Sequence, residues 1–552
     1  MNHRAIALAA ALLPALLACG ELDRSLAPAA DTHTIVYNIE EQPRSIDPAL
    51  TTELISGSVI QHVFEGLTNL GPNVTVEPGV AERWDVSEDG LQCDFYLRED
   101  SLWSDGLPVT AHDFVYSWTR VLTPETGAYY YSIMTCIENA EEFYNWDPDS
   151  GEPRPELGIE AITDHHLRVR LTHPVPFFLQ LMAFMTYMPV RQDIIEAHGR
   201  TWELSPETYI GNGVYRMTDY ERDYMIRMDL NPVHRDRETT AIENLVWYMI
   251  ADAQSEYIAY LTNSIDITYG VPYPTLPDIR AHIPEHLQNL PWIGIYYVSF
   301  NHRPERRAFQ DRRVRRAFAL ALDRARIGLE VTEGTRRGAV TFVPPGIPDA
   351  DHVSDFAANS GDLVPNYQPD EARRLLAEAG YPNGEGFPEV SYIFNTSVDH
   401  ARVAEMMQAA WRRELNIDVN LENMEWQVYL DNRREGNFDF GRGGWLGDYV
   451  DPMTFLDIWM TNNSNNRNGY SNPEFDRLIE RAWHTRDRDE YFRLCHEAEQ
   501  SLLEDGAAIP VYYYSNTFLQ NPAIEGLNIT PMGVMLFHDA HWNLETLAEA
   551  GL

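Results

Sequence analysis

The sequence predicts an α/β protein with two or more lobes, and three observations support this. The chain has 552 residues, more than a single hydrophobic core usually serves. Apolar residues make up 44% of it and aromatic residues 11%, which is ample for ordered globular lobes. Strand-like and helix-like runs alternate in the second half, most clearly between residues 390 and 421.

The first half is predicted to be rich in strands. Strands are expected at residues 34–39, 93–97 and 264–269, each a β-prone run bounded by turn residues. A helix is expected to begin after Thr110, because Asp113 then lies at the third helical position of a capping box.

The second half is predicted to follow a β-prone crossing strand at residues 290–301. A helix is expected at 369–379, where a glycine then ends it. A βαβ unit with parallel strands is expected from the strand, helix and strand at 390–395, 400–414 and 417–421.

The charge of the chain argues against nucleic acid as a partner. The formal net charge is −42, so phosphates would be repelled at long range. One basic run does not reverse this, because it opens an amphipathic pattern and is predicted to be a solvated helix face. It consists of Arg312, Arg313, Arg315 and Arg316.

The chain contains no lysine. A phosphate-loop lysine, a Schiff-base lysine and a Ser-x-x-Lys acylation site are therefore excluded. The sequence also lacks a Gly-x-Ser-x-Gly elbow and a His-Glu-x-x-His zinc motif. We expect a protein that is not an enzyme and that carries no cofactor and no metal.

Residues 1–19 are predicted to be a lipoprotein signal peptide. Arg4 gives a positive start, and the apolar run at 6–17 is too short to remain as a membrane helix. The run LLAC at 16–19 resembles a lipobox, in which Cys19 is lipidated and anchors the protein in the periplasm or cell envelope. Ordinary signal cleavage, which gives a free periplasmic protein, is the alternative. Residues 20–32 are expected to form a flexible tether.

Three further cysteines are present, Cys93, Cys136 and Cys495. Because an odd set cannot all pair internally, we expect buried thiols. A disulfide between Cys93 and Cys136 is the alternative.

The stretch 426–455 gathers groups suited to a zwitterion around a predicted strand-like run and a glycine-rich turn. They are Trp426, Arg433, Arg442, Trp445 and Asp448. A carboxylate holds an ammonium, guanidiniums hold a carboxylate, and indoles supply flat apolar walls. A free peptide is such a ligand. Taken singly, each residue has a structural alternative: a turn aspartate, a surface ion pair or a packed core tryptophan.

Several runs together resemble the family 5 extracellular solute-binding proteins. They are AERW at 81–84, WSDGLPVTA at 103–111, DFVYSW at 113–118, VRRA at 314–317 and ALDR at 321–324. Within that family, the block 425–455 and the run NTS at 395–397, followed by His400, are most similar to the oligopeptide binders of bacterial ABC importers.

The resemblance implies a two-lobed periplasmic-binding-protein fold of the Venus-flytrap type (cluster C), with an extra subdomain inserted into the first lobe. Two crossing strands would join the lobes, and the ligand would lie between them. Lobe I would comprise residues 33–68, 191–293 and 513–552, the inserted subdomain residues 69–190, and lobe II residues 294–512.

The resemblance also implies which residues contact the ligand. Asp448 would pair with the α-ammonium of a peptide. The C-terminal carboxylate would be met, at different peptide lengths, by Arg433, Arg442 and His400. Side-chain pockets and main-chain pairing would be provided by Trp426, Trp445, Tyr130, Gly443 and Gly444.

We therefore expect a monomeric substrate-binding lipoprotein that captures short oligopeptides and delivers them to an ABC permease and its ATPase. Dipeptide, nickel, haem and opine binding are the alternatives within the family. An exported peptidase is the alternative outside it. Delivery to a signalling partner also stays open.

The lysine-free, acidic composition generates a prediction about salt. Hydrated carboxylates keep proteins soluble in concentrated salt, and codon bias is the rival reason for the missing lysine. If the first reason holds, the unfolding free energy should rise when the salt concentration is increased to the molar range. The 84 acidic residues outnumber the 42 basic ones, and salt screens the repulsion among the excess negative charges. Unfolding curves across a salt series measure this, and no gain at molar salt contradicts it.

Overall fold

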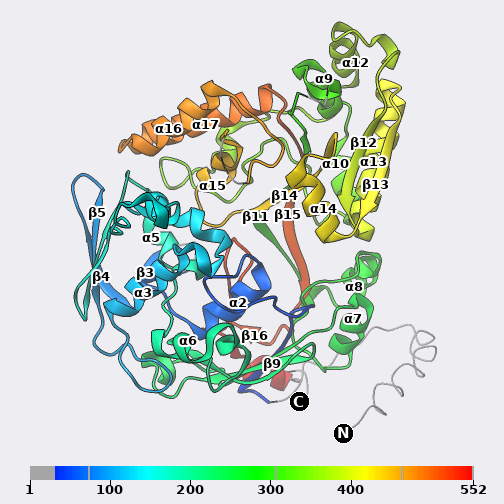
Figure 1. The fold of residues 1–552 in the computed structure, drawn as a ribbon. Coiled ribbons are helices and arrows are strands. Elements are labelled where there is room, and N and C mark those ends of the chain that lie inside the picture. Colours follow the sequence, from blue (N-terminus) through cyan, green and yellow to red (C-terminus); the bar gives the residue numbers. More distant parts are fainter. Residues whose placement is uncertain (1–30, 72–74, 305–306, 462, 464, 550–552) are drawn as a thin grey trace.

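The computed structural model describes residues 31–71, 75–304, 307–461, 463 and 465–549. The predicted signal peptide, Cys19 and most of the tether lie outside these residues. Two long antiparallel strands, β11 (Leu287–Phe300) and β15 (Ala508–Leu519), run between an upper and a lower part of the molecule (Figure 1). Within the described chain, no helix is long and apolar enough to span a bilayer.

The lower part contains a four-stranded sheet in the order β1-β10-β9-β8. Its β1 pairs in parallel with β10, and the other pairs are antiparallel. Trp542, near the end of the chain, donates its indole N–H to the Thr34 carbonyl at 3.0 Å, so the start, the middle and the end of the chain meet here. The elements are β1 (Thr34–Asn38), α2 (Leu54–Val63), α6 (Gln192–His198), β8 (Tyr215–Glu221), β9 (Met225–Leu230), β10 (Asn244–Tyr248), α7 (Ala253–Leu261), α8 (Leu276–His282) and α18 (Leu544–Glu549).

A second sheet, in the order β4-β5-β7-β6, flanks the lower part on the side of α3 and α5 (Figure 1). The expected capping box is present at the start of α3, where Asp113 Oδ2 accepts from the Thr110 N–H at 2.8 Å. On the same helix Trp118 is fully buried and donates to the Tyr187 carbonyl at 2.9 Å. The elements are β2 (Thr68–Leu70), β3 (Val76–Pro78), β4 (Ala81–Val86), β5 (Gln92–Leu97), α3 (Ala111–Val121), α4 (Ala140–Tyr144), β6 (Ile159–Thr163), β7 (His166–Arg170) and α5 (Phe178–Leu181).

The upper part is built on a five-stranded sheet in the order β13-β12-β14-β11-β15. The predicted βαβ unit is confirmed, since β12 and β13 are parallel and α13 connects them. Trp411 on α13 is fully buried and donates to the Phe318 carbonyl at 2.9 Å. The elements are α9 (Arg312–Leu320), α10 (Arg324–Val331), α11 (Phe356–Ser360), α12 (Pro369–Glu378), β12 (Val390–Asn395), α13 (Val398–Leu415), β13 (Val419–Met424), α14 (Trp426–Glu435), β14 (Phe440–Leu446), α15 (Met453–Leu456), α16 (Pro473–His484) and α17 (Arg488–Glu504).

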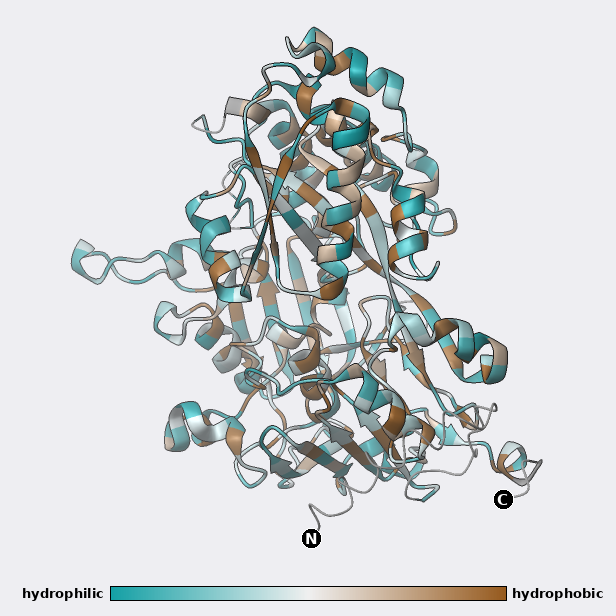
Figure 2. Cartoon of the chain, turned by 90° about the vertical axis from the view of Figure 1, so that its right-hand side faces the viewer, coloured by the Kyte–Doolittle hydropathy of each residue, from teal (hydrophilic) through white to brown (hydrophobic). Residues whose placement is uncertain are grey.

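Apolar residues collect on the sheets and on the inward faces of the helices, whereas the outer helix faces are hydrophilic (Figure 2). Those outer faces carry arginine–carboxylate pairs one turn apart, such as Arg326–Glu330 at 2.6 Å. Such exposed pairs contribute little to stability individually. The boundaries between the two lobes and the insertion stay a prediction.

The strand-like run expected within 426–455 is β14, and residues 426–435 before it form the helix α14, because the Glu425 carboxylate caps the Gln427 N–H at 2.8 Å and Gly436 ends the helix with a φ of 77°. Two expectations about local structure are wrong. Residues 264–269 form no strand, and Ile267 makes only isolated bridges. Arg315 does not lie on a solvated face: it is 3% exposed, and its guanidinium donates to main-chain carbonyls, including that of Phe309 at 2.8 Å.

The three described cysteines are free thiols. Cys93 and Cys495 are buried, and Cys136 is half-buried. The bridge between Cys93 and Cys136 that the sequence left open is therefore not formed.

Candidate functional site

A cavity of about 590 Å³ lies between the upper and the lower part. Its walls come from the start of α2, the region of residues 130 and 184–185, and the crossing strands. Residues 532–534 and the strand β14 with the turn that follows it complete them. Seven of the nine residues expected at the site line it, namely Tyr130, His400, Trp426, Arg442, Gly444, Trp445 and Asp448. Elements far apart in sequence therefore converge on one enclosed space.

Asp448 places a carboxylate in this cavity. The Tyr130 hydroxyl donates to its Oδ1 at 3.0 Å, and its own N–H donates to Thr454 Oγ1 at 3.1 Å. Among the described residues, no arginine or histidine forms an ion pair with it. Burial raises the pKa of Asp448 to about 7, and the hydrogen bond from Tyr130 acts in the opposite direction. The cavity thus holds an acidic group that lacks a cationic partner.

Two arginines line the cavity without a carboxylate partner in the part of the chain that the structure describes. Arg442 donates from Nη2 to the Tyr514 hydroxyl at 3.1 Å, and Arg336 lies 5.3 Å from the centre of the Tyr512 ring. The Nε atoms of both arginines are buried and make no hydrogen bond within the described chain. These guanidiniums are held by tyrosines and keep donors for an anion.

His400 lies beside these arginines, with its ring 5.5 Å from that of Tyr296. Burial, together with the positive charges of the nearby Arg442 and Arg336, lowers its pKa to about 3. The imidazole is therefore neutral at pH 7. Its Nδ1 is buried and has no partner among the described residues, so the ring can still offer one hydrogen bond.

The strand β14 has an open edge beside the cavity. It pairs with β12 only at Phe440 and Gly441, and with β11 along its whole length. The Gly447 N–H donates to the Ile293 carbonyl at 2.8 Å. Along an antiparallel ladder, residues that bond to the partner strand alternate with residues that do not. The main-chain groups of Gly444 and Leu446 therefore point away from β11. Both residues line the cavity, so this edge can pair with an extended ligand.

Gly443 and Arg433, which were also expected at the site, do not line the cavity. Successive residues of a strand face opposite sides, and a Cβ on Gly443 would lie 2.4 Å from the Tyr297 ring. Arg433 is buried behind β14, where its Nη1 donates to the Arg442 carbonyl at 2.7 Å and its Nη2 to Ser299 Oγ at 3.1 Å. Arg433 thus supports the strand from the side away from the cavity.

Other wall residues were not predicted from the sequence. Trp292 on β11 and Arg336 line the cavity, as do two acids, Glu53 and Asp399. Ser56 donates to Glu53 Oε1 at 2.6 Å, and the Glu53 carboxylate lies 3.7 Å from Arg44. No local motif marks these residues, because each is brought to the cavity by chain segments outside the 426–455 stretch.

Comparison with known proteins identifies the family. The family model for bacterial extracellular solute-binding proteins, family 5, matches residues 75–467. The chain belongs to the family 5 solute-binding proteins.

Family 5 relatives match over nearly the whole chain. The periplasmic oligopeptide-binding protein OppA of Salmonella typhimurium is 34% identical over 94% of this chain and 95% of its own. The dipeptide-binding protein DppE of Bacillus subtilis is 32% identical over 92% and 91%. Haemophilus influenzae OppA in complex with RPPGFSPFR superposes with a TM-score of 0.78 at 29% identity, covering 93% of this chain and 99% of that one. The chain thus has the two-lobed periplasmic-binding-protein fold, and the upper part corresponds to the predicted lobe II.

The two central glycines of β14 give a matched test of the strand's two faces. Gly443→Ala should lower the unfolding free energy by about 1–3 kcal/mol, because its methyl group meets the buried Tyr297 ring. Gly444→Ala should cost less, because the nearest atoms are the far ends of the Tyr514 and Arg442 side chains, at 2.6 and 2.9 Å. Denaturant unfolding of both variants measures the difference. Equal losses would contradict the assigned faces.

Proposed function

We propose that this protein binds short peptides in the cavity between its lobes and delivers them to an ABC importer. The observation that carries the proposal is the Asp448 carboxylate, which is half-buried in the cavity with no cation paired to it in the described chain. The names of relatives such as OppA and DppE support it, since they describe oligopeptide and dipeptide binding.

The ammonium end of a peptide suits Asp448. Removing a carboxylate from water is costly unless an opposite charge compensates it. A ligand ammonium supplies that charge, and the Tyr130 hydroxyl already orients the carboxylate. Binding then converts an unfavourable buried acid into a charge-assisted pair.

The carboxylate end suits Arg442, Arg336 and His400. The two arginines retain unpaired Nε donors, and the neutral imidazole adds a further group. A planar guanidinium can hold a carboxylate with two parallel bonds. The two guanidiniums and the imidazole offer several partners for the ligand carboxylate. Peptides of different lengths can therefore be bound, which favours oligopeptides over one fixed length.

The middle of the peptide suits the open edge of β14 and the two indoles. Main-chain pairing with Gly444 and Leu446 gives affinity that does not depend on sequence. Trp426 and Trp445 present broad apolar surfaces to varied side chains.

The rival ligands can be separated by calorimetry. Tripeptides and tetrapeptides should give heat of binding, and heat from dipeptides alone would establish the dipeptide alternative. Nickel should give none, since the described residues contain no group of three or more histidines, cysteines and carboxylates able to hold a metal. Prolonged incubation followed by mass spectrometry tests the peptidase alternative, and peptide loss would support it.

The proposal includes a cellular setting. The protein is lipidated at Cys19, is located in the periplasm or cell envelope, is a monomer, and delivers its ligand to a permease with its ATPase. Labelling with a radioactive fatty acid, compared between the unaltered protein and Cys19→Ala, tests the lipid anchor.

Replacing the acid tests the ammonium site. Asp448→Asn should weaken the binding of trialanine by about 2–5 kcal/mol, the range for removing one partner of a buried charge pair. N-acetylated trialanine should bind the unaltered protein equally poorly, because it lacks the ammonium. Asp399→Asn is the matched control, an acid in the same cavity that lies near Arg336 and should matter little. Unchanged affinity in Asp448→Asn would refute the role.

The affinity for peptides should depend on pH. Because the pKa of Asp448 is about 7, its carboxyl group is protonated below that pH, and a proton must leave before the ammonium binds. The affinity should therefore fall as the pH drops below about 7, by up to about tenfold per unit, and fall again above about 8 as the peptide amine loses its proton. His400 adds no change between pH 5 and 8, because its pKa is about 3.

Titration calorimetry from pH 5 to 9 measures this profile. Two other buried acids nearby, Asp451 and Asp457, have pKa values raised by burial to about 6 and about 8. The same titration on Asp448→Asn separates their influence, since the dependence below pH 7 should flatten there. A flat profile in the unaltered protein would contradict the prediction.

A further inference from the structure

The turn that carries Asp448 is contacted at three consecutive residues by the opposite part of the molecule. The Tyr130 hydroxyl donates to Asp448 Oδ1 at 3.0 Å. The Tyr449 ring stacks on that of Phe177, with centroids 3.9 Å apart and planes 9° apart. The Val450 N–H donates to Gln180 Oε1 at 2.9 Å. Tyr130, Phe177 and Gln180 all belong to the predicted inserted subdomain, and the turn belongs to lobe II.

Lobe II holds the same turn from behind. Thr454 Oγ1 accepts from the Asp448 N–H, and the Tyr491 hydroxyl donates to Asp451 Oδ1 at 2.5 Å. These contacts fix the two ends of the turn. They leave the Val450 N–H and the Tyr449 ring to partners across the lobe interface.

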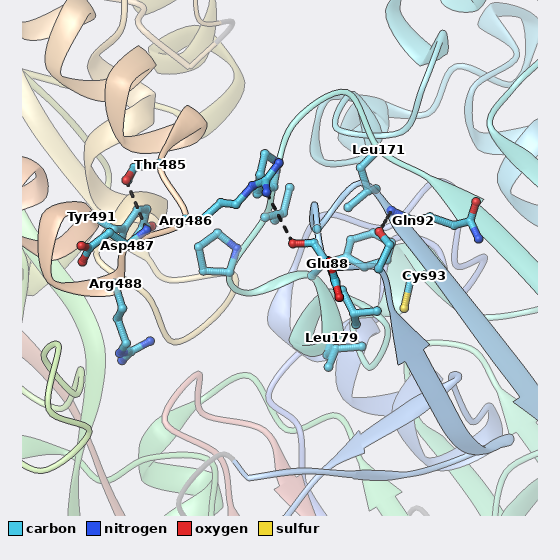
Figure 3. A pocket seen from close by; sticks show the side chains of 17 residues that line it. Glu88, Gln92, Cys93, Leu171, Leu179, Thr485, Arg486, Asp487, Arg488 and Tyr491 are labelled. Atoms are coloured by element: carbon cyan, nitrogen blue, oxygen red, sulfur yellow. Dashed lines mark hydrogen bonds between the residues drawn. The ribbon is translucent and has the colours of Figure 1, made fainter.

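The segment around Phe177 and Gln180 also closes a second crevice. This crevice, of about 350 Å³, is lined by Val175, Phe178 and Leu179 on one side and by residues 485–488 with Tyr491 on the other. Figure 3 shows Arg486 reaching across it toward Glu88, where Arg486 Nη1 donates to the Glu88 carbonyl at 3.4 Å. The segment thus lies between the crevice and the Asp448 turn, and it packs on lobe II through both faces.

We propose that Phe177 and Gln180 are positioning residues, which hold the turn so that the Asp448 carboxylate meets the ligand ammonium only when the lobes are closed. When the lobes part, the Val450 N–H exchanges the Gln180 acceptor for water and the Tyr449 ring loses the stacked Phe177 ring, so nothing from the opposite part of the molecule then fixes the turn. The turn then loses its fixed geometry together with the Tyr130 hydrogen bond. Recognition of the ammonium is in this way tied to closure. This inference rests on the proposed peptide-binding function.

The test compares two ligands that differ only at the amino end, trialanine and N-acetyl-trialanine, by titration calorimetry. Phe177→Ala and Gln180→Ala should each weaken trialanine binding by up to about tenfold, the effect of one net contact of about 1 kcal/mol. N-acetyl-trialanine should change less than about twofold, since it makes no ion pair for the turn to position. In the Asp448→Asn background, both substitutions should lose their effect on trialanine.

Two controls sharpen the result. Phe177→Tyr keeps the stacked ring and should bind trialanine like the unaltered protein. Trp483→Ala removes the stack of Trp483 on His173, a lobe contact away from the turn with centroids 5.6 Å apart, and should affect both ligands by the same factor or not at all. Both Phe177 and Gln180 are half-buried, so the folded state should tolerate either truncation.

The outcomes separate the two proposals. Equal losses for both ligands in Phe177→Ala and Gln180→Ala would make these residues general closure contacts and overturn the positioning role alone. Selectivity for the free amine in Trp483→Ala would overturn it too. Failure of the unaltered protein to bind trialanine and other short peptides would overturn the proposed function and the inference with it.

Discussion

The central constraint in this molecule is a carboxylate buried with no cation paired to it in the described chain. Asp448 is half-buried in the cavity between the two parts of the molecule, where the Tyr130 hydroxyl donates to its carboxylate. Such a group is stabilised by protonation or by an incoming positive charge. The two parts of the molecule, the crossing strands and the turn reduce the contact of this position with water and leave a cavity of about 590 Å³ beside it. A stronger internal partner would stabilise the protein and remove the reason to bind.

The opposite charges of the site are kept apart by tyrosines. Arg442 and Asp448 lie six residues apart on one strand and its turn, yet they form no ion pair. Hydroxyl groups and aromatic rings hold Arg442 and Arg336 instead, and they do so without neutralising them. Because the site does not satisfy itself, both charges remain for a zwitterion. The neutral His400 adds hydrogen bonding without adding repulsion to this cationic wall.

Much of this arrangement was predictable from the sequence, and the failures have physical causes. The βαβ unit and the α3 capping box follow from periodicity and caps, and seven of the nine residues implied by the resemblance line the cavity. Gly443 does not line it, and the side to which a strand residue points can be assigned only once the register is known. Arg433 does not line it either, because the helix α14 carries it behind β14, which no local pattern shows. Arg336, Glu53 and Trp292 were missed because only tertiary folding brings them to the cavity.

The meeting of Trp542 with Thr34 has a consequence for how the chain matures. The first lobe lacks this hydrogen bond until the segment around Trp542 has been made, and the two residues are 508 positions apart. Contacts between residues so far apart in sequence form slowly, because a long loop must close first. Docking of the Trp542 segment on β1 should therefore be among the late steps in the folding of this lobe.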